Sequence, residues 1–191
     1  ENGVINKTLS WKIGNLISEK NYENGNVQGL FTSFHENGEL FFLGNYKNGN
    51  QVGIWKTFNN KGVLQNEKIW WENGILKSKK NYKNEKGDVL YKEFDEKGFI
   101  KSKGFYKEGE KYGFWEFFDG EDEPCDYGHF KNGLKEGPWI ERGENGSYTK
   151  GERHGVWEHR WGGEESSKGK YKNGVQVEFW EEYFYDMNQK F

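Results

Sequence analysis

The sequence contains no alanine, and it has only one cysteine, two prolines and one methionine. Alanine is the strongest helix former. Its absence beside 27 glycines, nine tryptophans, eleven tyrosines and fifteen phenylalanines favours strands joined by tight turns. Only 32% of the residues are hydrophobic, which excludes a conventional aliphatic core. Aromatic side chains each bury roughly 150–250 Å², so they must supply most of the apolar area.

Other classes of protein are excluded by further absences. The single cysteine, Cys125, excludes an internal disulfide framework. No apolar run approaches the ~18 residues of a membrane-spanning helix, and no secretory signal heads the chain. Because the sequence starts at Glu1 without a methionine, its location stays open between the bacterial cytoplasm and export after removal of a leader.

The spacing Tyr-x-x-Gly-x-x-x-Gly-x-Trp recurs along the chain with minor substitutions. Its copies end at an aromatic residue: Phe31, Trp55, Trp115, Trp139, Trp157 and Trp180. Self-similarity at a short period is typical of arrays in which each unit buries its apolar face against its neighbours. The chain is therefore interpreted as a repeat array.

Asn-Gly occurs eight times, and it is the dipeptide that two-residue hairpin turns prefer. A turn at Asn48-Gly49 predicts, by counting outward, that Gly44 faces Gly53 and that the residue at 42 faces Trp55. The same count gives facing glycines in four copies. Glycine weakens a strand unless its space is needed, so we expect neighbouring rings to lie flat over the bare backbone as an aromatic ladder.

These features predict an all-β fold, an elongated single-layer twisted antiparallel sheet of consecutive β-hairpins with about sixteen strands. One array is expected over residues 1–191, with clear repeats at about 14–183. Irregularities are expected at 62–91, where a further strand and turn is inserted, and at 119–127. Residues 181–191 are expected to cap the array as a strand or a short helix, with acidic side chains that protect the edge.

Four segments carry a family resemblance: YKNGNQVGIW, YKEGEKYGFW, FKNGLKEGPW and the intervening WENGILKSKKNY. They resemble MORN repeats, and more closely the bacterial MORN variant with YwqK-type antitoxin-like repeats. The resemblance implies a chain of β-hairpins with a grooved face that serves as a binding scaffold. Related arrays bind phospholipids or protein partners or accompany a catalytic domain, and the bacterial variant is described as an antitoxin or immunity partner. The glycine pattern of the family is broken at 82–91.

No constellation for enzyme chemistry is present, since the sequence has no nucleophile elbow, phosphate-binding loop or dinucleotide fingerprint. The histidines are scattered, and His154 and His159 would point to opposite faces of one strand. With Cys125 they offer no metal-ligand spacing. We therefore expect a non-enzymatic protein with no cofactor, no metal and no nucleic-acid partner.

Charge is unevenly distributed along the chain. Residues 112–191 carry 17 acidic and ten basic residues, whereas residues 61–111 carry 13 lysines and nine acidic residues. The acidic run within 119–126 lacks the ordered spacing of a calcium loop, so it is interpreted as a solvated loop. The lysines from Lys77 to Lys86 leave contact with an anionic surface open, although nearby acidic residues dilute their field.

Five tryptophans share one repeat position, and tyrosines lead several copies, which makes these rings the main candidates for contact with a partner. The candidate binding residues are Trp55, Trp115, Trp139, Trp157, Trp180, Tyr46, Tyr106 and Tyr171. Two alternatives stay open. The rings form either an exposed strip that holds a polypeptide, a partner strand or a sugar chain, or an internal ladder.

The sequence thus predicts a monomeric, non-enzymatic repeat scaffold that mediates protein-protein interaction. One alternative is an antitoxin or immunity protein that neutralises a toxin, with its grooved face or its acidic C-terminal half against a basic surface. Another is a module that binds anionic lipid or glycan.

Overall fold

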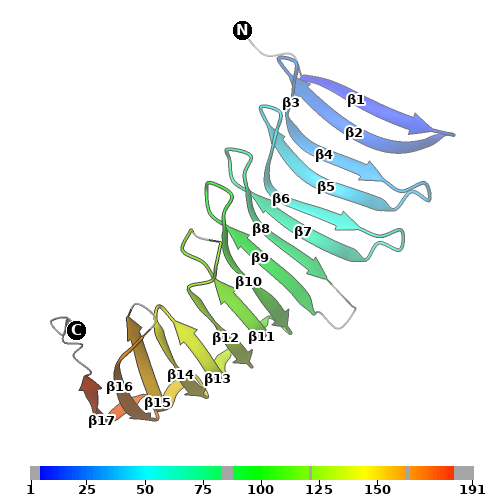
Figure 1. Cartoon of the computed structure of the whole chain (residues 1–191). Helices are drawn as coiled ribbons and strands as arrows, with labels where there is room; N and C mark the ends of the chain where they lie inside the picture. The colour runs from blue at the N-terminus through cyan, green and yellow to red at the C-terminus, as the bar shows by residue number, and fades with distance from the viewer. Residues whose placement is uncertain (1–4, 83–87, 121, 162–163, 183–191) are drawn as a thin grey trace. The chain divides into compact units, whose positions relative to one another are not determined.

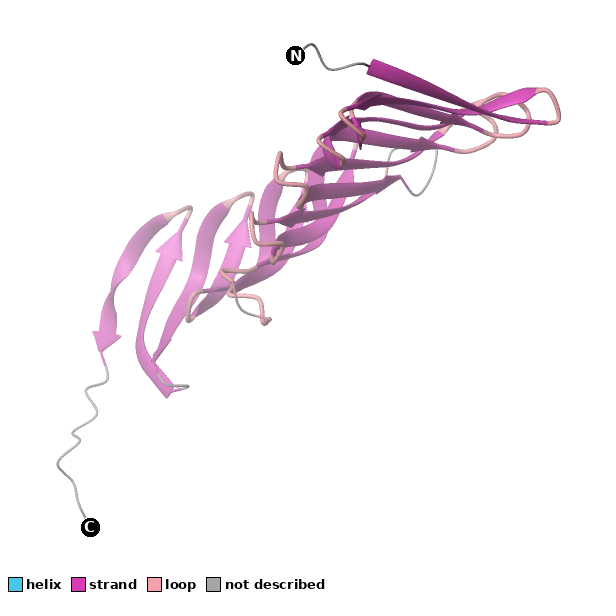
Figure 2. Cartoon of the chain, turned by 90° about the horizontal axis from the view of Figure 1, so that it is seen from above, coloured by secondary structure: helices cyan, strands magenta, loops and turns pink. Residues whose placement is uncertain are grey.

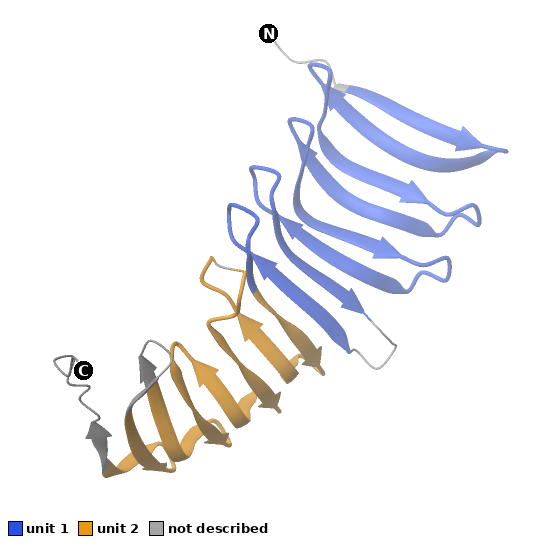
Figure 3. Ribbon diagram, in the orientation of Figure 1, with its two compact units in different colours: residues 1–101 blue, residues 102–191 orange. Residues whose placement is uncertain are grey.

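The computed structural model describes four ranges of the chain: 5–82, 88–120, 122–161 and 164–182. Within them, the side chains at 5, 160–161, 164–166 and 179–182 are not described. The chain divides into two compact units, residues 1–101 (unit 1) and residues 102–191 (unit 2), coloured separately in Figure 3. The expectation of one continuous array over the chain stays a prediction.

All regular elements in the described ranges are β-strands, and each unit is a single layer of antiparallel hairpins (Figures 1 and 2). Unit 1 contains β1 (Ile5–Lys12), β2 (Asn15–Glu23), β3 (Asn26–Val27), β4 (Gly29–Phe34), β5 (Leu40–Lys47), β6 (Asn50–Phe58), β7 (Leu64–Trp70), β8 (Leu76–Tyr82) and β9 (Val89–Phe94). The predicted all-β, single-layer hairpin fold is confirmed. No helix of the described chain is long and apolar enough to cross a membrane.

Unit 2 continues the same pattern, with its first strand beginning two residues before the unit boundary. Its strands are β10 (Ile100–Lys107), β11 (Glu110–Phe117), β12 (Asp126–Lys131), β13 (Leu134–Glu141), β14 (Glu144–Thr149), β15 (Glu152–Trp161), β16 (Glu164–Lys172) and β17 (Val175–Glu182). The predicted irregularity at 119–127 begins between β11 and β12, and its last two residues, 126–127, open β12. Of the expected cap, 181–182 end β17, and 183–191 lie outside the described residues.

The inserted strand and turn that the sequence predicts within 62–91 is β7 and the turn after it. The structure has a strand at this place, and its reading as an insertion in the repeat stays a prediction. The rest of that irregular stretch contains 83–87, which the structure does not describe.

The register follows the sequence count beside each turn but shifts at the glycines. The residues on either side of Gly44 are two apart in β5, whereas their partners in β6, Val52 and Lys56, are four apart. Strand β6 therefore has two extra residues there, which form a bulge. The predicted pairing of the two glycines is wrong, and Phe42 pairs with Thr57 instead of with the tryptophan. Similar shifts occur in the β10–β11, β12–β13 and β14–β15 hairpins.

The two glycines of a copy have different roles, which is why they do not face each other. A Cβ on Gly44 would lie 2.2 Å from the Trp55 ring, so this position needs the space. Gly53 has open space around it but a φ of 64°, in the left-handed region that other residues resist. The same division holds for three pairs in unit 2: Gly104 and Gly113, Gly128 and Gly137, Gly146 and Gly155.

Candidate functional site

Each of four tryptophans lies against a glycine of the preceding strand. In the copy that ends at Trp139, a Cβ on Gly128 would lie 2.4 Å from the indole ring. The indole N–H donates to the carbonyl oxygen of His129 at 3.0 Å. The other three indoles make the same bond at 2.9–3.2 Å, ten residues back along the chain. Since one ring face meets bare backbone and the N–H is satisfied, each ring is fixed in place. We call this side of the sheet the tryptophan face.

In unit 2, a basic side chain four residues before each tryptophan lies over its ring. The distances to the ring centroid are 4.4 Å for Lys111 Nζ over Trp115, 4.3 Å for Lys135 Nζ over Trp139, and 3.9 Å for Arg153 Cζ over Trp157. The glycine backbone meets one face of each ring and the cation covers the other. The three rings are therefore enclosed on both sides, and their exposed fractions are 1%, 2% and 0%.

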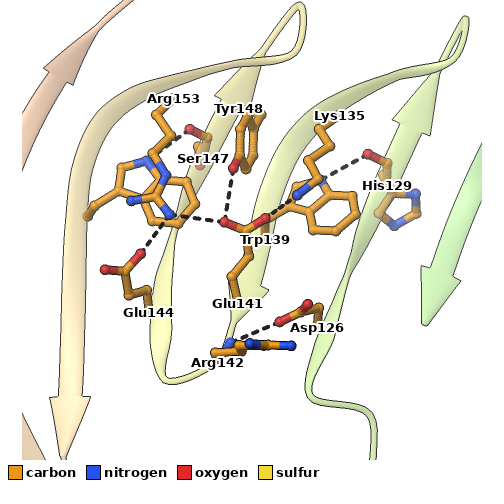
Figure 4. Close-up of polar contacts among 11 residues, drawn as sticks. Asp126, His129, Lys135, Trp139, Glu141, Arg142, Glu144, Ser147, Tyr148 and Arg153 are labelled. Atoms are coloured by element: carbon orange, nitrogen blue, oxygen red, sulfur yellow. Dashed lines mark hydrogen bonds and ion pairs between the residues drawn. The ribbon is translucent and has the colours of Figure 1, made fainter. Parts of the chain in front are cut away.

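An ion-pair network holds two of these cations in place (Figure 4). Glu141 accepts hydrogen bonds from Lys135, from the Tyr148 hydroxyl at 2.9 Å and from Arg153 Nη2 at 3.1 Å. Arg153 Nη2 also donates to Glu144 at 2.6 Å. The carboxylates at 141 and 144 thus neutralise the positive charges that lie over the rings.

Burial opposes the charge of Glu141, but hydrogen bonds from Lys135 and Tyr148 and the charge of Lys135 outweigh it, so the pKa of Glu141 lies below its ordinary value. Burial also opposes the charge of Arg153, yet its hydrogen bonds to Tyr148 and Glu144 raise its pKa above the usual range. Glu141 and Arg153 are therefore both charged at neutral pH. The cations of the network are engaged within the protein.

These contacts decide between the two alternatives for three of the predicted binding tryptophans. Trp115, Trp139 and Trp157 form an internal ladder, and a partner could touch their faces only by displacing the covering cation. Trp55 is slightly more open, at 6% exposed. Trp180 belongs to β17, and its side chain lies outside the described part. A role for these rings in binding stays a prediction.

The three predicted binding tyrosines pack against the same ladder. Tyr46 and Tyr106 stand edge-on to the tryptophan of their own copy, with ring centroids 4.9 Å and 5.1 Å apart. Tyr171 lies 6.5 Å from the Trp157 ring. All three are half-buried. They contribute to the packing of the tryptophan face.

The opposite face of unit 2 carries an open groove of about 600 Å³. Large apolar side chains line it and remain exposed, with exposed fractions of 41% for Phe114, 37% for Ile140 and 52% for Val156. Pro138 adds further apolar surface. Contiguous exposed apolar surface with a polar rim marks interaction sites on soluble proteins. This groove is the candidate functional site, and we call its side of the sheet the groove face.

Cross-strand pairing places the groove residues side by side, because directly paired residues share a face of the sheet. The relevant pairs are Phe114 with His129, Tyr127 with Ile140, Pro138 with Ser147, and Asn145 with Glu158. Phe114 also contacts the rings of Tyr127 and His129, at 6.0 Å and 5.3 Å between centroids. Asn145 Nδ2 donates to Glu158 Oε2 at 3.2 Å. Aromatic and aliphatic surface is thus combined with an amide and a carboxylate.

The exposed groove residues Phe114, Ile140 and Val156 are not among the binding residues predicted from the sequence. A signal was present, since the residue directly before each tryptophan is apolar: Ile54, Phe114, Pro138 and Val156. In unit 1 the corresponding Leu30 and Ile54 are also exposed, at 47% and 50%.

Other predicted features are distributed over the surface. In the lysine run, Lys77 Nζ lies 4.1 Å from the Trp71 ring centroid and Lys80 pairs with Glu67 at 3.5 Å. Lys83 and Lys86 lie outside the described residues. Within the described ranges, no group of three or more histidine, cysteine or acidic residues is arranged to hold a metal ion.

A scan against protein-family models found no match for this chain, and a search of curated proteins found none either.

Proposed function

We propose that this protein is a non-enzymatic repeat scaffold that binds a segment of another protein in the groove of unit 2. The observation that carries the proposal is the contrast between the two faces. The tryptophan face is closed by internal cations, whereas the groove face leaves Phe114, Ile140 and Val156 exposed. Exposed apolar side chains on a rigid sheet lower the free energy when a partner covers them.

The chemistry of the groove indicates the kind of segment it would take. Its floor is apolar, and Glu158 supplies a carboxylate at its rim. Residues 112–191 carry a formal net charge of −7, from 17 acidic and ten basic residues, and such a field attracts basic partners. The segment we expect therefore combines apolar side chains, which fill the groove, with lysine or arginine.

A narrower form of the proposal is a MORN-type antitoxin or immunity protein that blocks a basic toxin surface. The acidic balance of unit 2 and the repeated hairpins support this reading. It predicts a complex that salt weakens and that charge reversal at Glu178, Glu181 and Glu182 removes. A lipid-binding module would instead depend on Lys77 to Lys86, and a glycan-binding module would need no protein partner.

The test is a native pull-down followed by mass spectrometry, in which the wild-type protein is compared with Val156→Glu. This variant places a charge in the groove. Val156 is 52% exposed, so the variant should fold normally. We expect capture of the specific partner to be lost. The matched control is Leu134→Glu, at a position that is also exposed, at 49%, but does not line the groove.

Direct contact can then be checked by cross-linking through a photoreactive residue at 156. Cross-links to an apolar and basic segment of the captured protein would support the proposal. Capture that survives Val156→Glu, or that Leu134→Glu removes equally, would show that the groove is not the binding site. A purified chain that turns over a substrate without a partner would contradict the non-enzymatic assignment.

A further inference from the structure

One tryptophan of the ladder lacks the cation that covers the other three. The residue four positions before Trp55 is Gln51, where unit 2 has lysine or arginine. The residue two positions after Trp55 is Thr57, whereas Trp139 has Glu141 there. The ion pair above the Trp139 ring is thus replaced at Trp55 by two shorter neutral side chains. Among the described residues, no cation lies over the Trp55 ring.

The missing ion pair leaves a hollow of about 240 Å³ on the tryptophan face of unit 1. Its lining combines four aromatic rings with polar side chains: Phe31, Phe42, Tyr46, Trp55, Gln51, Thr57, Asn66 and Lys68. Phe31 is stacked near Trp55 at 5.7 Å between centroids, and Tyr46 stands edge-on to it at 4.9 Å. Several rings around one hollow form an aromatic cage, the arrangement that recognises ammonium groups.

Two lysines lie beside the rings of this region, although neither lies over Trp55. Lys20 is over Phe31, a ring of the cage, and Lys68 is over Trp70, a ring outside it. Lys20 Nζ is 5.5 Å from the Phe31 centroid, and Lys68 Nζ is 5.9 Å from that of Trp70. No carboxylate belongs to the described lining of the hollow, in contrast to Glu141 in unit 2. A bare cation would therefore meet uncompensated positive charge, whereas a ligand that carries its own acid group would neutralise Lys68.

We propose that this hollow binds a small zwitterion, with a quaternary ammonium over the Trp55 ring and an acid group at Lys68. The ligand supplies from outside the ion pair that Lys135 and Glu141 supply internally in unit 2. The site is on the tryptophan face of unit 1 and is independent of the groove. Its chemistry is shared by free betaine-like compounds and by phosphocholine head groups.

The first probe is glycine betaine, titrated while the Trp55 indole N–H resonance is followed by NMR. That N–H donates to the Asn45 carbonyl oxygen at 3.1 Å, so it reports directly on the ring. We expect a saturable shift of this resonance and none at Trp139. The control probe is 3,3-dimethylbutanoate, which has the same shape and carboxylate but no positive charge, and it should bind about tenfold more weakly.

Variants of the lining separate the two halves of the ligand. Lys68→Gln should weaken the binding of glycine betaine about tenfold, because the carboxylate of this ligand loses its contact with the lysine. The same variant should strengthen the binding of tetramethylammonium, which has no acid group. Gln51→Lys/Thr57→Glu rebuilds the pair of the Trp139 copy and should abolish the shift. Gln65→Lys is the matched control, since residue 65 is exposed in the same strand as Lys68 but does not line the hollow.

Phosphatidylcholine vesicles distinguish the source of the ligand. Binding of free betaine without sedimentation on vesicles supports a soluble zwitterion, and sedimentation that Gln51→Lys/Thr57→Glu removes supports a head group. Equal binding of 3,3-dimethylbutanoate, which lacks the positive charge, a shift that survives Gln51→Lys/Thr57→Glu, or no saturable shift with any probe would overturn the proposal.

Discussion

Units 1 and 2 share the same hairpin but close the tryptophan face differently. In unit 2 each of Trp115, Trp139 and Trp157 lies between a glycine and a cation. In unit 1 Trp55 meets its glycine but has no cation, and Gln51 leaves a hollow beside it. The glycine contact is therefore a property of the backbone bulge, whereas the cation is a separate addition. That addition determines whether the outer face of the ring is covered by a cation or borders a hollow.

The largest expected effect comes from removing an enclosed ring. Trp157→Ala takes away a side chain that is 0% exposed, together with its cation contact and its N–H bond. We expect unit 2 to lose about 3–5 kcal/mol of stability. The measurement is hydrogen exchange of the β14 and β15 amides, because repeat proteins often unfold locally rather than as one body.

Trp55→Ala is the comparison variant for unit 1. The Trp55 ring already borders a hollow and has no covering cation. The loss of stability in Trp55→Ala should therefore be smaller than that in Trp157→Ala. Equal losses in the two units would mean that the covering cation adds nothing to stability, and the contrast between the units would then concern ligand access alone.

The next effect concerns the glycines under the rings. A methyl group on Gly128 would lie 2.4 Å from the Trp139 ring, so Gly128→Ala forces the ring against Lys135. We expect a loss of about 1–3 kcal/mol, read from urea unfolding. Gly44→Ala creates a similar clash with Trp55, at 2.2 Å, but this ring can move into the hollow, so the loss should be smaller.

Gly137→Asn tests the other glycine role in the same hairpin. Gly137 has a φ of 71° and open space around it, and asparagine tolerates the left-handed region better than other residues. Gly137→Asn should therefore lower the free energy of unfolding by well under half as much as Gly128→Ala does. If asparagine at 137 were the more harmful change, the two roles would be wrongly assigned.

The hairpins could be predicted from the sequence because turn signals and aromatic spacing are local. The bulge could not, since a glycine needed for space and a glycine needed for positive φ look alike in a sequence. Gly44 and Gly53 were therefore paired by simple counting. The shifted register brings the indole N–H of Trp55 to the carbonyl oxygen of Asn45, ten residues earlier on the neighbouring strand, and sequence spacing does not show such a contact.

The candidate groove was also only partly predictable. Sequence spacing placed the tryptophans together on one face, but it did not show which face is covered. The covering side chains, Lys111, Lys135 and Arg153, lie four residues before each tryptophan. Their contact with the indole rings could not be predicted from the sequence, because it depends on the bulge. Once that face is closed, the residues directly before the tryptophans become the exposed apolar row.

A smaller effect depends on pH and is confined to unit 2. The pKa of Glu141 is lower in the folded protein than its ordinary value of 4.5. Its contribution is therefore fully present above the unfolded pKa and is lost as the pH falls through the folded one. The urea midpoint of unit 2 should drop as the solution is acidified below about pH 4.5.

Glu141→Gln should remove this acid sensitivity, with a loss of about 1–2 kcal/mol at neutral pH and a difference from wild type that shrinks in acid. In unit 1 the described carboxylate with a lowered pKa, Glu36, is fully exposed beside Lys12, and such pairs contribute little. Hydrogen exchange in unit 1 should therefore change less. A wild-type acid transition that Glu141→Gln leaves intact would place its cause elsewhere.

The last comparison contrasts an indole N–H that is hydrogen-bonded with one that is not. Trp139 donates to the His129 carbonyl oxygen, whereas the buried Nε1 atom of Trp70 in unit 1 has no hydrogen-bond partner. Trp139→Phe should cost about 1–3 kcal/mol, because it leaves a carbonyl without its donor. Trp70→Phe removes an unpaired polar group and should change stability by less than about 0.5 kcal/mol, or increase it. Urea unfolding of both variants checks the difference, and a large loss in Trp70→Phe would show that its ring area, rather than its N–H, dominates at that position.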